Sequence, residues 1–235
     1  MAAKVLGSGS PGHTFNAYVD PQGAILSSKI QQLTGITPQK LAAAGAKPFP
    51  SVWADFCGFL GRVAASTGGS GAGGAAAEGQ GSSGGAGRPG GGRVALVAHN
   101  APFDHRFLSQ ELDRAGLNRF AMGEAGIVCM VDSLPLLQDA RLWRAGSSQR
   151  RSGGSPQWDL PKPPPKYSLE SVYRHLFQTD MPGAHDAQGD VEGLESVLLS
   201  PTIKNRWRYI SSTIPKGQIP VVSSTSELKD RVLGP

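Results

Sequence analysis

The hydrophobic positions fall into strand-like and helix-like patterns, interrupted by two long polar or glycine-rich stretches. Residues 2–6 and 13–19 have strand character, and the glycine-rich residues 7–12 between them predict a hairpin turn. Two short helices joined by a turn at Gly35 are expected next. Apolar residues at three- and four-residue spacing then predict an amphipathic helix over 51–64.

The second half of the chain alternates apolar runs with helical patterns. Residues 93–98 and 126–131 each contain a continuous hydrophobic run, as in strands buried on both faces of a sheet. A helix over 103–115 is expected after the first strand. After the second, Asp132 is expected to cap a helix that runs to about Arg144.

Two more helices are expected, one starting at the N-cap residue Ser168 and one over about 187–199. Glycine makes up 13 of the 26 residues from 67 to 92, so this segment cannot bury enough apolar surface to offset its ordering entropy. The expected organisation is one α/β domain over 1–199, a flexible Gly-rich insertion at 67–92, a basic and proline-rich insertion at 145–166, and a C-terminal tail over 200–235.

Composition narrows the class of protein. The 235 residues are 39% hydrophobic, enough for one domain with a core, while 32 Gly and 18 Pro fit the two insertions. Cys57 and Cys129 lie in apolar runs and are expected to be reduced core residues. No apolar run reaches the length of a membrane helix or resembles a signal peptide, so we expect an intracellular protein, in the nucleus or cytoplasm, without a membrane partner.

The positive charge is concentrated in one segment. Between Arg141 and Lys166 there are six Lys and Arg against one Asp, which equals the entire net charge of +5. The segment is either a solvated basic loop or a rim that attracts phosphate, and in the second case Arg150 and Arg151 are candidate nucleic-acid contacts.

Two corners combine acids and histidines. "HNAPFD" (99–104) joins a predicted buried strand to a helix, where Phe103 and Phe107 are expected to anchor the helix from below. "HDAQGD" (185–190) opens the last helix, and Asp190 faces its buried side, where a carboxylate needs a cation or several hydrogen-bond donors. The alternative is that these acids and histidines only cap helices.

The two corners together carry a resemblance. "HNAPFD" followed by "HDAQGD" resembles the second and third motifs of the DEDDh 3′→5′ exonucleases, H-N-x-x-F-D and H-x-A-x-x-D. The likeness is nearest to the three-prime repair exonucleases, with "LTGITPQKLAAAG", "VDSLPLL" and "KYSLESVYRHLF" as supporting stretches. It spans roughly residues 2–199. It implies a ribonuclease H-like fold, a mixed sheet flanked by helices.

The resemblance implies a chemistry and assigns residues to it. Such enzymes cleave the terminal phosphodiester with two divalent ions, Mg²⁺ or Mn²⁺, which oxygen ligands hold. Asp104 and Asp190 correspond to metal-binding acids, and His185 to the general base that takes the proton of the attacking water. Leu33 matches a position that packs on the terminal base. The expected nucleic-acid contacts are Leu33, His99, Asn100 and Phe103.

One motif of the family is missing. The family's first motif is D-x-E, which lies on the first and central strand and supplies the other two acids. No D-x-E occurs ahead of residue 13. The hairpin would then have no strand to bridge it to 94–98, which leaves two strand edges unpaired. Truncation, a degenerate fold kept as a binding module, and completion in trans all remain open.

The sequence therefore leaves two alternative functions. The first is a metal-dependent 3′→5′ exonuclease acting on DNA ends, preferably single-stranded, with this chain a truncated or weakly active form. The second is a catalytically silent module that binds nucleic acid or protein. RNA as an alternative substrate and a homodimer stay open in both.

Overall fold

The computed structural model describes residues 1–9, 11–67, 93–117, 120–140, 142–143, 163–204 and 221–222. The Gly-rich insertion expected at 67–92 lies outside them except for its first residue, and most of the basic insertion expected at 145–166 does too. Arg150 and Arg151 belong to that undescribed part, so their role stays a prediction from the sequence.

The chain starts with the predicted hairpin. Strand β1 (Ala2–Lys4) pairs antiparallel with β2 (Thr14–Asn16), and a short 3-10 helix, η1 (Pro11–His13), leads into β2. The strands are shorter than the predicted 2–6 and 13–19, because Gly7 at φ 74° begins the turn and Val19 forms a single bridge to Lys47 instead.

Three helices follow the hairpin. Helix α1 (Ser28–Thr34) is capped by Ser27, whose side chain accepts a hydrogen bond from the N–H of Ile30, and it ends at Gly35 in the left-handed conformation. Helix α2 (Pro38–Ala43) and the long α3 (Phe49–Thr67) come next. The apolar face of α3 is buried as its periodicity predicted, through Phe49, Val52, Trp53, Phe56, Phe59 and Leu60.

The second sheet is parallel and has the order β3-β4-β5, with β3 at Val94–Ala98, β4 at Ile127–Asp132 and β5 at Val221–Val222. Strand β4 is almost entirely buried, as predicted. The burial predicted for β3 is wrong: all five of its residues are only partly buried. The reason is that β3 is an edge strand that faces a cavity.

The helices of the second half differ in length from their predictions. Helix α4 (Ala101–Arg114) matches its predicted helix closely, and the short α5 (Ala121–Glu124) precedes β4. Helix α6 (Ser133–Gln138) is capped by Asp132 as expected but ends six residues before the predicted Arg144, because the cap residue Asp139 is extended.

Helices α7 (Leu169–Phe177) and α8 (Ala187–Leu199) agree with the sequence. Ser168 is the N-cap of α7 by position, although its hydroxyl bonds Ser171 and no backbone N–H. Ile203, in the expected tail, is fully buried in the core with Leu136 and Val197, and β5 pairs with β4. Parts of the expected tail therefore belong to the fold.

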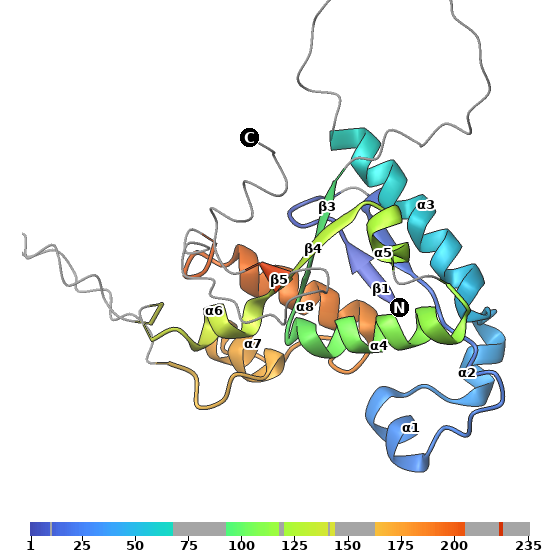
Figure 1. Ribbon diagram of the computed structural model, residues 1–235. Helices are drawn as coiled ribbons and strands as arrows, with labels where there is room; N and C mark the ends of the chain where they lie inside the picture. The colour runs from blue at the N-terminus through green and yellow to red at the C-terminus, as the bar shows by residue number, and fades with distance from the viewer. Residues whose placement is uncertain are drawn as a thin grey trace, which may run out of the picture.

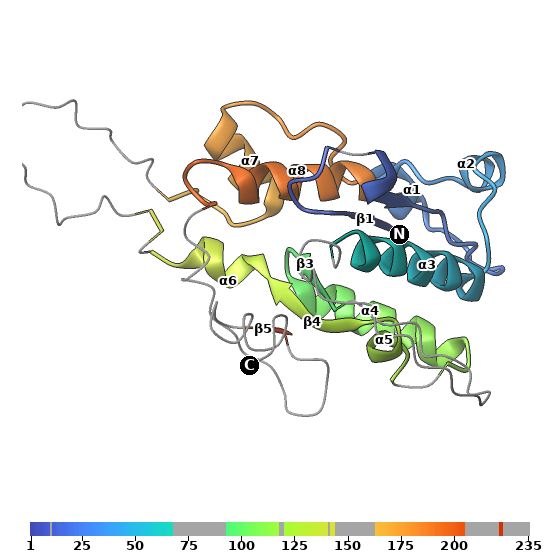
Figure 2. The same cartoon turned by 90° about the horizontal axis from the view of Figure 1, so that it is seen from above.

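The fold is mixed α/β, and its two small sheets share no strand pairing in the described ranges. In the view of Figure 1, α3 lies to the right of β1, β3 and β4. In Figure 2, α8 and β1 lie on one side of the molecule, while β4, α4 and α5 lie on the other. No helix of the described residues is long and apolar enough to span a membrane.

Candidate active site

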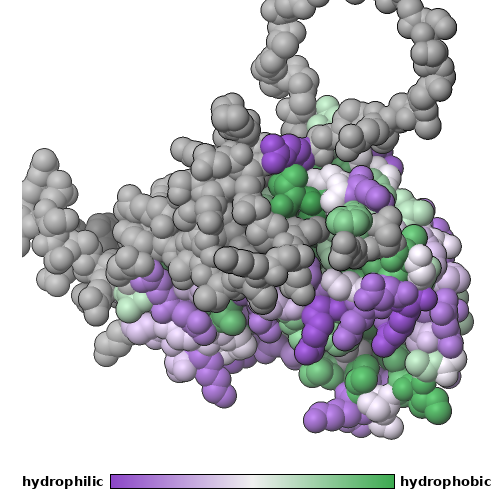
Figure 3. All heavy atoms as spheres, viewed as in Figure 1, coloured by the Kyte–Doolittle hydropathy of each residue, from purple (hydrophilic) through white to green (hydrophobic). Residues whose placement is uncertain are grey.

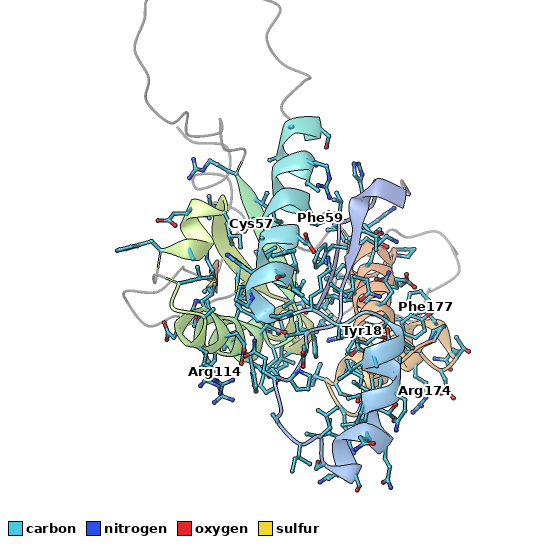
Figure 4. The ribbon with its side chains drawn as sticks, turned by 90° about the vertical axis from the view of Figure 1, so that its right-hand side faces the viewer. Tyr18, Cys57, Phe59, Arg114, Arg174 and Phe177 are labelled. Atoms are coloured by element: carbon cyan, nitrogen blue, oxygen red, sulfur yellow. The ribbon has the colours of Figure 1, made fainter. Side chains whose placement is uncertain are left out.

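A cavity of about 1060 Å³ lies between the two halves of the fold and contains most of the predicted site residues. Its walls come from β1, α3, β3, α4 and α8. Figure 4 shows α3 in front, between the α4 side and the α7 side, with Phe59 and Cys57 on opposite sides of the helix. The predicted site residues on the wall are His99, Phe103, Asp104, His185 and Asp190. We call this space the central cavity.

Asp104 reaches the central cavity from the first turn of α4. The turn before it is tight, with Asn100 in the left-handed conformation at φ 67° and a proline in the first turn of the helix. Burial raises the pKa of the Asp104 carboxyl, and the nearby charge of Asp132 raises it further. An acid in this position favours neutralisation by a proton or a cation.

Asp190 reaches the same cavity from the first turn of α8. Its Oδ1 accepts a hydrogen bond from the backbone N–H of His185 at 3.1 Å. Part of its role is therefore to satisfy the backbone of the turn before α8, as expected if the acids only cap helices. Burial is again the first cause that raises its pKa, with Glu170 and Asp186 adding to it and the contacts to His185 opposing it. Asp186 is the N-cap of α8 and accepts from the N–H of Gln188.

His185 stands in an exposed turn just before α8. Its backbone is left-handed at φ 69°, and its Nε2 lies 3.0 Å from Oε1 of Glu170 on α7. A carboxylate on one ring nitrogen fixes the orientation of an imidazole. Sequence reasoning missed Glu170, because nothing in "SLESVY" indicates that α7 packs beside the turn before α8.

His99 and Asn100 have structural partners that the sequence did not reveal. The His99 ring contacts Oγ of Ser133 at 3.1 Å and the carbonyl oxygen of Tyr167 at 2.8 Å, and burial lowers its pKa. The N–H of Asn100 donates to Oδ1 of Asp132 at 2.9 Å. These bonds tie the end of β3 to the starts of α6 and α7, and the predicted nucleic-acid contacts of the two residues stay predictions.

Phe103 and Phe107 do not anchor α4 in the core, so that expectation is wrong. They are 51% and 46% exposed, their ring centroids are 4.6 Å apart, and both line the central cavity. The guanidinium of Arg106 lies 5.8 Å and 5.6 Å from the two ring centroids. Exposed aromatic rings beside a cation can stack on nucleobases.

Leu33 lies apart from this group. It is 54% exposed on α1 and does not line the central cavity. Ile25 and Ile30 are exposed in the same region, and Figure 3 shows hydrophobic residues there, below a hydrophilic band over α4. The structure therefore does not bring Leu33 together with Asp104 and Asp190.

The donor chemistry of the cavity fits a divalent cation only in part. Asp104 and Asp190 offer hard oxygen ligands, and in the described residues no Lys or Arg lies within ion-pair distance of either. However, the described part of the chain has no group of three or more His, Cys, Asp or Glu side chains able to hold a metal ion. Asp104 and Asp190 therefore do not complete a metal site by themselves.

Comparison with known proteins gives one relevant similarity. The chain is 36% identical over 110 residues to the Mus musculus protein named "Three prime repair exonuclease 2". This match supports a relationship to exonucleases. It covers 46% of this chain, and the chain spans 39% of the length of that relative. No protein-family model matches the chain.

Proposed function

We propose that the central cavity is the active site of a divalent-metal-dependent 3′→5′ exonuclease of the DEDDh class, built on a ribonuclease H-like fold. The substrate is a DNA 3′ end, preferably single-stranded. Asp104 and Asp190 would supply two of the oxygen ligands of the metal, and His185 would be the general base. A divalent ion, when bound, supplies charge neutralisation for the phosphodiester and lowers the pKa of a water nucleophile.

The observation that carries the proposal is the meeting of the two sequence corners. Asp104 and the pair His185 and Asp190 are about 80 positions apart in the chain, yet they line one cavity. Desolvation in the cavity raises the pKa of both carboxyl groups, and perturbed pKa values of this kind gather at functional sites. The partial match to a named exonuclease supports the same reaction kind.

The chain's own residues have separate tasks in this proposal. The tight turn at Asn100 fixes Asp104 on one wall, and the bond between the His185 N–H and Asp190 fixes the other wall. Glu170 accepts a hydrogen bond at Nε2 of the His185 ring, which leaves Nδ1 of the neutral imidazole as the proton acceptor. Phe103 offers a ring for the base of the terminal nucleotide.

The test is shortening of a 3′-labelled single-stranded DNA with Mg²⁺ or Mn²⁺, with chelator as the blank. We expect slow, metal-dependent removal of nucleotides. Asp190→Ala and Asp104→Ala should each lower the rate at least about 100-fold, since metal-held charge contributes several kcal/mol to such a transition state. Asp113→Ala, on the exposed face of α4, is the matched control and should be neutral.

Two results would reject the proposal for this chain. One is the absence of any metal-dependent shortening when circular dichroism shows that the protein is folded. The other is shortening that persists in Asp190→Ala, which would identify a contaminant or a different site.

One observation favours a second function: no three metal-binding side chains lie together among the described residues. In that case the chain is a catalytically silent module that binds single-stranded nucleic acid without metal. Binding that is unchanged by chelator, together with no shortening, would select it over the exonuclease.

A further inference from the structure

Helix α4 carries an exposed aromatic stripe that begins at the proposed active site. Phe103 and Phe107 are 51% and 46% exposed, and both line the central cavity together with Asp104. The two rings come from positions four residues apart on one helix, so about 6 Å separates them along its axis. Phe107 is therefore one turn farther from the start of the helix than Phe103.

The two rings cannot share one base. Their centroids are 4.6 Å apart, which is less than the two stacking distances of about 3.4 Å each that a base between them would need. Their planes are tilted by 46°, so a flat base that stacks on one ring does not lie parallel to the other. Each ring is therefore available to a different base. The axial step of about 6 Å between the rings falls between one and two rises of a stacked strand, which corresponds to neighbouring nucleotides.

Arg106 adds a positive charge to this stripe. Its guanidinium lies 5.8 Å from the ring centroid of Phe103 and 5.6 Å from that of Phe107. The residue is exposed and does not line the cavity, so it lies at the outer side of the two rings. Among the described residues, no carboxylate lies within ion-pair distance of it. The donors of this guanidinium are therefore available to a phosphate.

The stripe ends after the two rings. One turn beyond Phe107, Glu111 lines the cavity and forms an ion pair with Arg114. This pair adds neither net charge nor an aromatic face to the wall. Helix α4 therefore offers stacking places for two bases.

We propose that Phe107 and Arg106 form a subsite for the nucleotide next to the 3′-terminal one. The terminal base lies on Phe103, the next base stacks on Phe107, and the guanidinium of Arg106 binds the backbone phosphate between them. The ligand is a DNA 3′ end with at least two unpaired nucleotides, because a base inside a duplex is not accessible for stacking on a side chain. This inference rests on the proposed function, which places the 3′ end beside Asp104.

The test is the binding of short, fluorescent single-stranded DNA, measured by anisotropy in the presence of a chelator that prevents metal-dependent cleavage. An intact oligonucleotide is compared with one that is abasic at the second nucleotide from the 3′ end and with one that is abasic at the fourth. For the unmodified protein, the abasic residue at the second position should weaken binding about fivefold or more, since one stacked base is lost. The abasic residue at the fourth position should have little effect.

Variants of Phe107 assign the contact to this ring. Phe107→Leu keeps an apolar side chain and should weaken the intact oligonucleotide about fivefold or more. It should not further weaken the oligonucleotide that is abasic at the second position, because both changes remove the same contact. Phe107→Tyr retains the ring and should bind as the unmodified protein does. Phe177→Leu, which removes an exposed ring outside the cavity wall, is the control, and thermal unfolding checks that each variant is folded.

A variant of Arg106 tests the phosphate contact. Arg106→Gln should reduce the slope of log affinity against log salt by about 0.7, the value for one phosphate of a single strand. Arg62→Gln is the matched control, because Arg62 is exposed on α3 and lies outside the cavity wall, and its slope should not change. An unchanged slope in Arg106→Gln would overturn the phosphate contact.

Three outcomes would overturn the stacking on Phe107. The first is that no oligonucleotide binds, and the second is that Phe107→Leu changes the affinity for all three equally or not at all. The third is an equal effect of the abasic residue at both positions, which would show stacking without a fixed register. The exonuclease is judged separately. If Phe107→Leu and the second base prove to depend on each other without any metal-dependent shortening, the subsite stands and the nuclease fails, whereas shortening without that dependence gives the reverse.

Discussion

Gly189 lies where the turn carrying His185 packs onto α8, and alanine at this position should disturb both. A Cβ on Gly189 would lie 2.1 Å from the carbonyl oxygen and 2.7 Å from the Cα of Gly183. Ordinary contact begins at 3.4 Å, so the turn must move by about 1.3 Å. The same carbonyl accepts a hydrogen bond from the N–H of Asp186, the N-cap of α8, so the movement also strains the cap.

The magnitude follows from two opposing terms. Overpacking against backbone costs about 1–3 kcal/mol, while alanine in place of glycine inside a helix gains about 0.5–1 kcal/mol. The difference is a loss of roughly 0–2.5 kcal/mol, and because the 2.1 Å contact is with backbone we expect about 1–2 kcal/mol, or about 2–8 °C in thermal midpoint. The proposed exonuclease activity should fall as well, because the bond between the His185 N–H and Asp190 depends on this turn.

Gly61→Ala is the matched control. Gly61 is an exposed position of α3, and a Cβ there would meet nothing within 4 Å. Only the stabilisation of alanine over glycine inside a helix then remains, and the thermal midpoint should rise by about 1–4 °C. Thermal unfolding followed by circular dichroism measures both variants. If Gly189→Ala proves as stable as the unmodified protein, the close packing of the 183–186 turn on α8 is refuted.

The remaining predictions concern pH and nucleic-acid binding. Burial lowers the pKa of His99 and of His105, so the unfolded chain binds more protons than the folded chain below about pH 6.5. The unfolding free energy should therefore fall as pH drops through that value. Urea titrations should show a smaller fall in His99→Gln, and the same dependence of unfolding free energy on pH in both proteins would contradict this. Phe103→Ala should weaken single-stranded DNA binding about tenfold with little effect on unfolding. The control Phe177→Ala removes another exposed ring and should leave DNA binding unchanged. Replacing Arg150 and Arg151 by Ala should reduce the slope of log affinity against log salt by about 1.4, and an unchanged slope would show that neither touches phosphate.

Local patterns were enough to predict most elements. The boundaries of α8 and the capping of α6 by Asp132 follow from helical spacing and from side chains that satisfy their own helix ends, and the structure confirms both. The hairpin followed from the glycine-rich turn between two strand-like runs. These features depend on residues within a few positions of each other.

Tertiary contacts decided the elements that the sequence described wrongly. The run "VALVA" has the composition of a central strand, but β3 is only half-buried because nothing pairs with its second edge in the described ranges. Phe103 and Phe107 have core-like spacing, yet they face the central cavity. Periodicity shows which face of an element is apolar, but not whether another element covers it.

The candidate site divides in the same way. The sequence alone indicated which side chains would carry the proposed chemistry, since the resemblance to the two motifs marks Asp104, His185 and Asp190 as a set. Only the tertiary structure decided that these three line one cavity, that Glu170 meets His185, and that Leu33 lies apart. The physical reason is that a motif fixes neighbours along a helix or turn, whereas distances between helices depend on how their apolar faces pack.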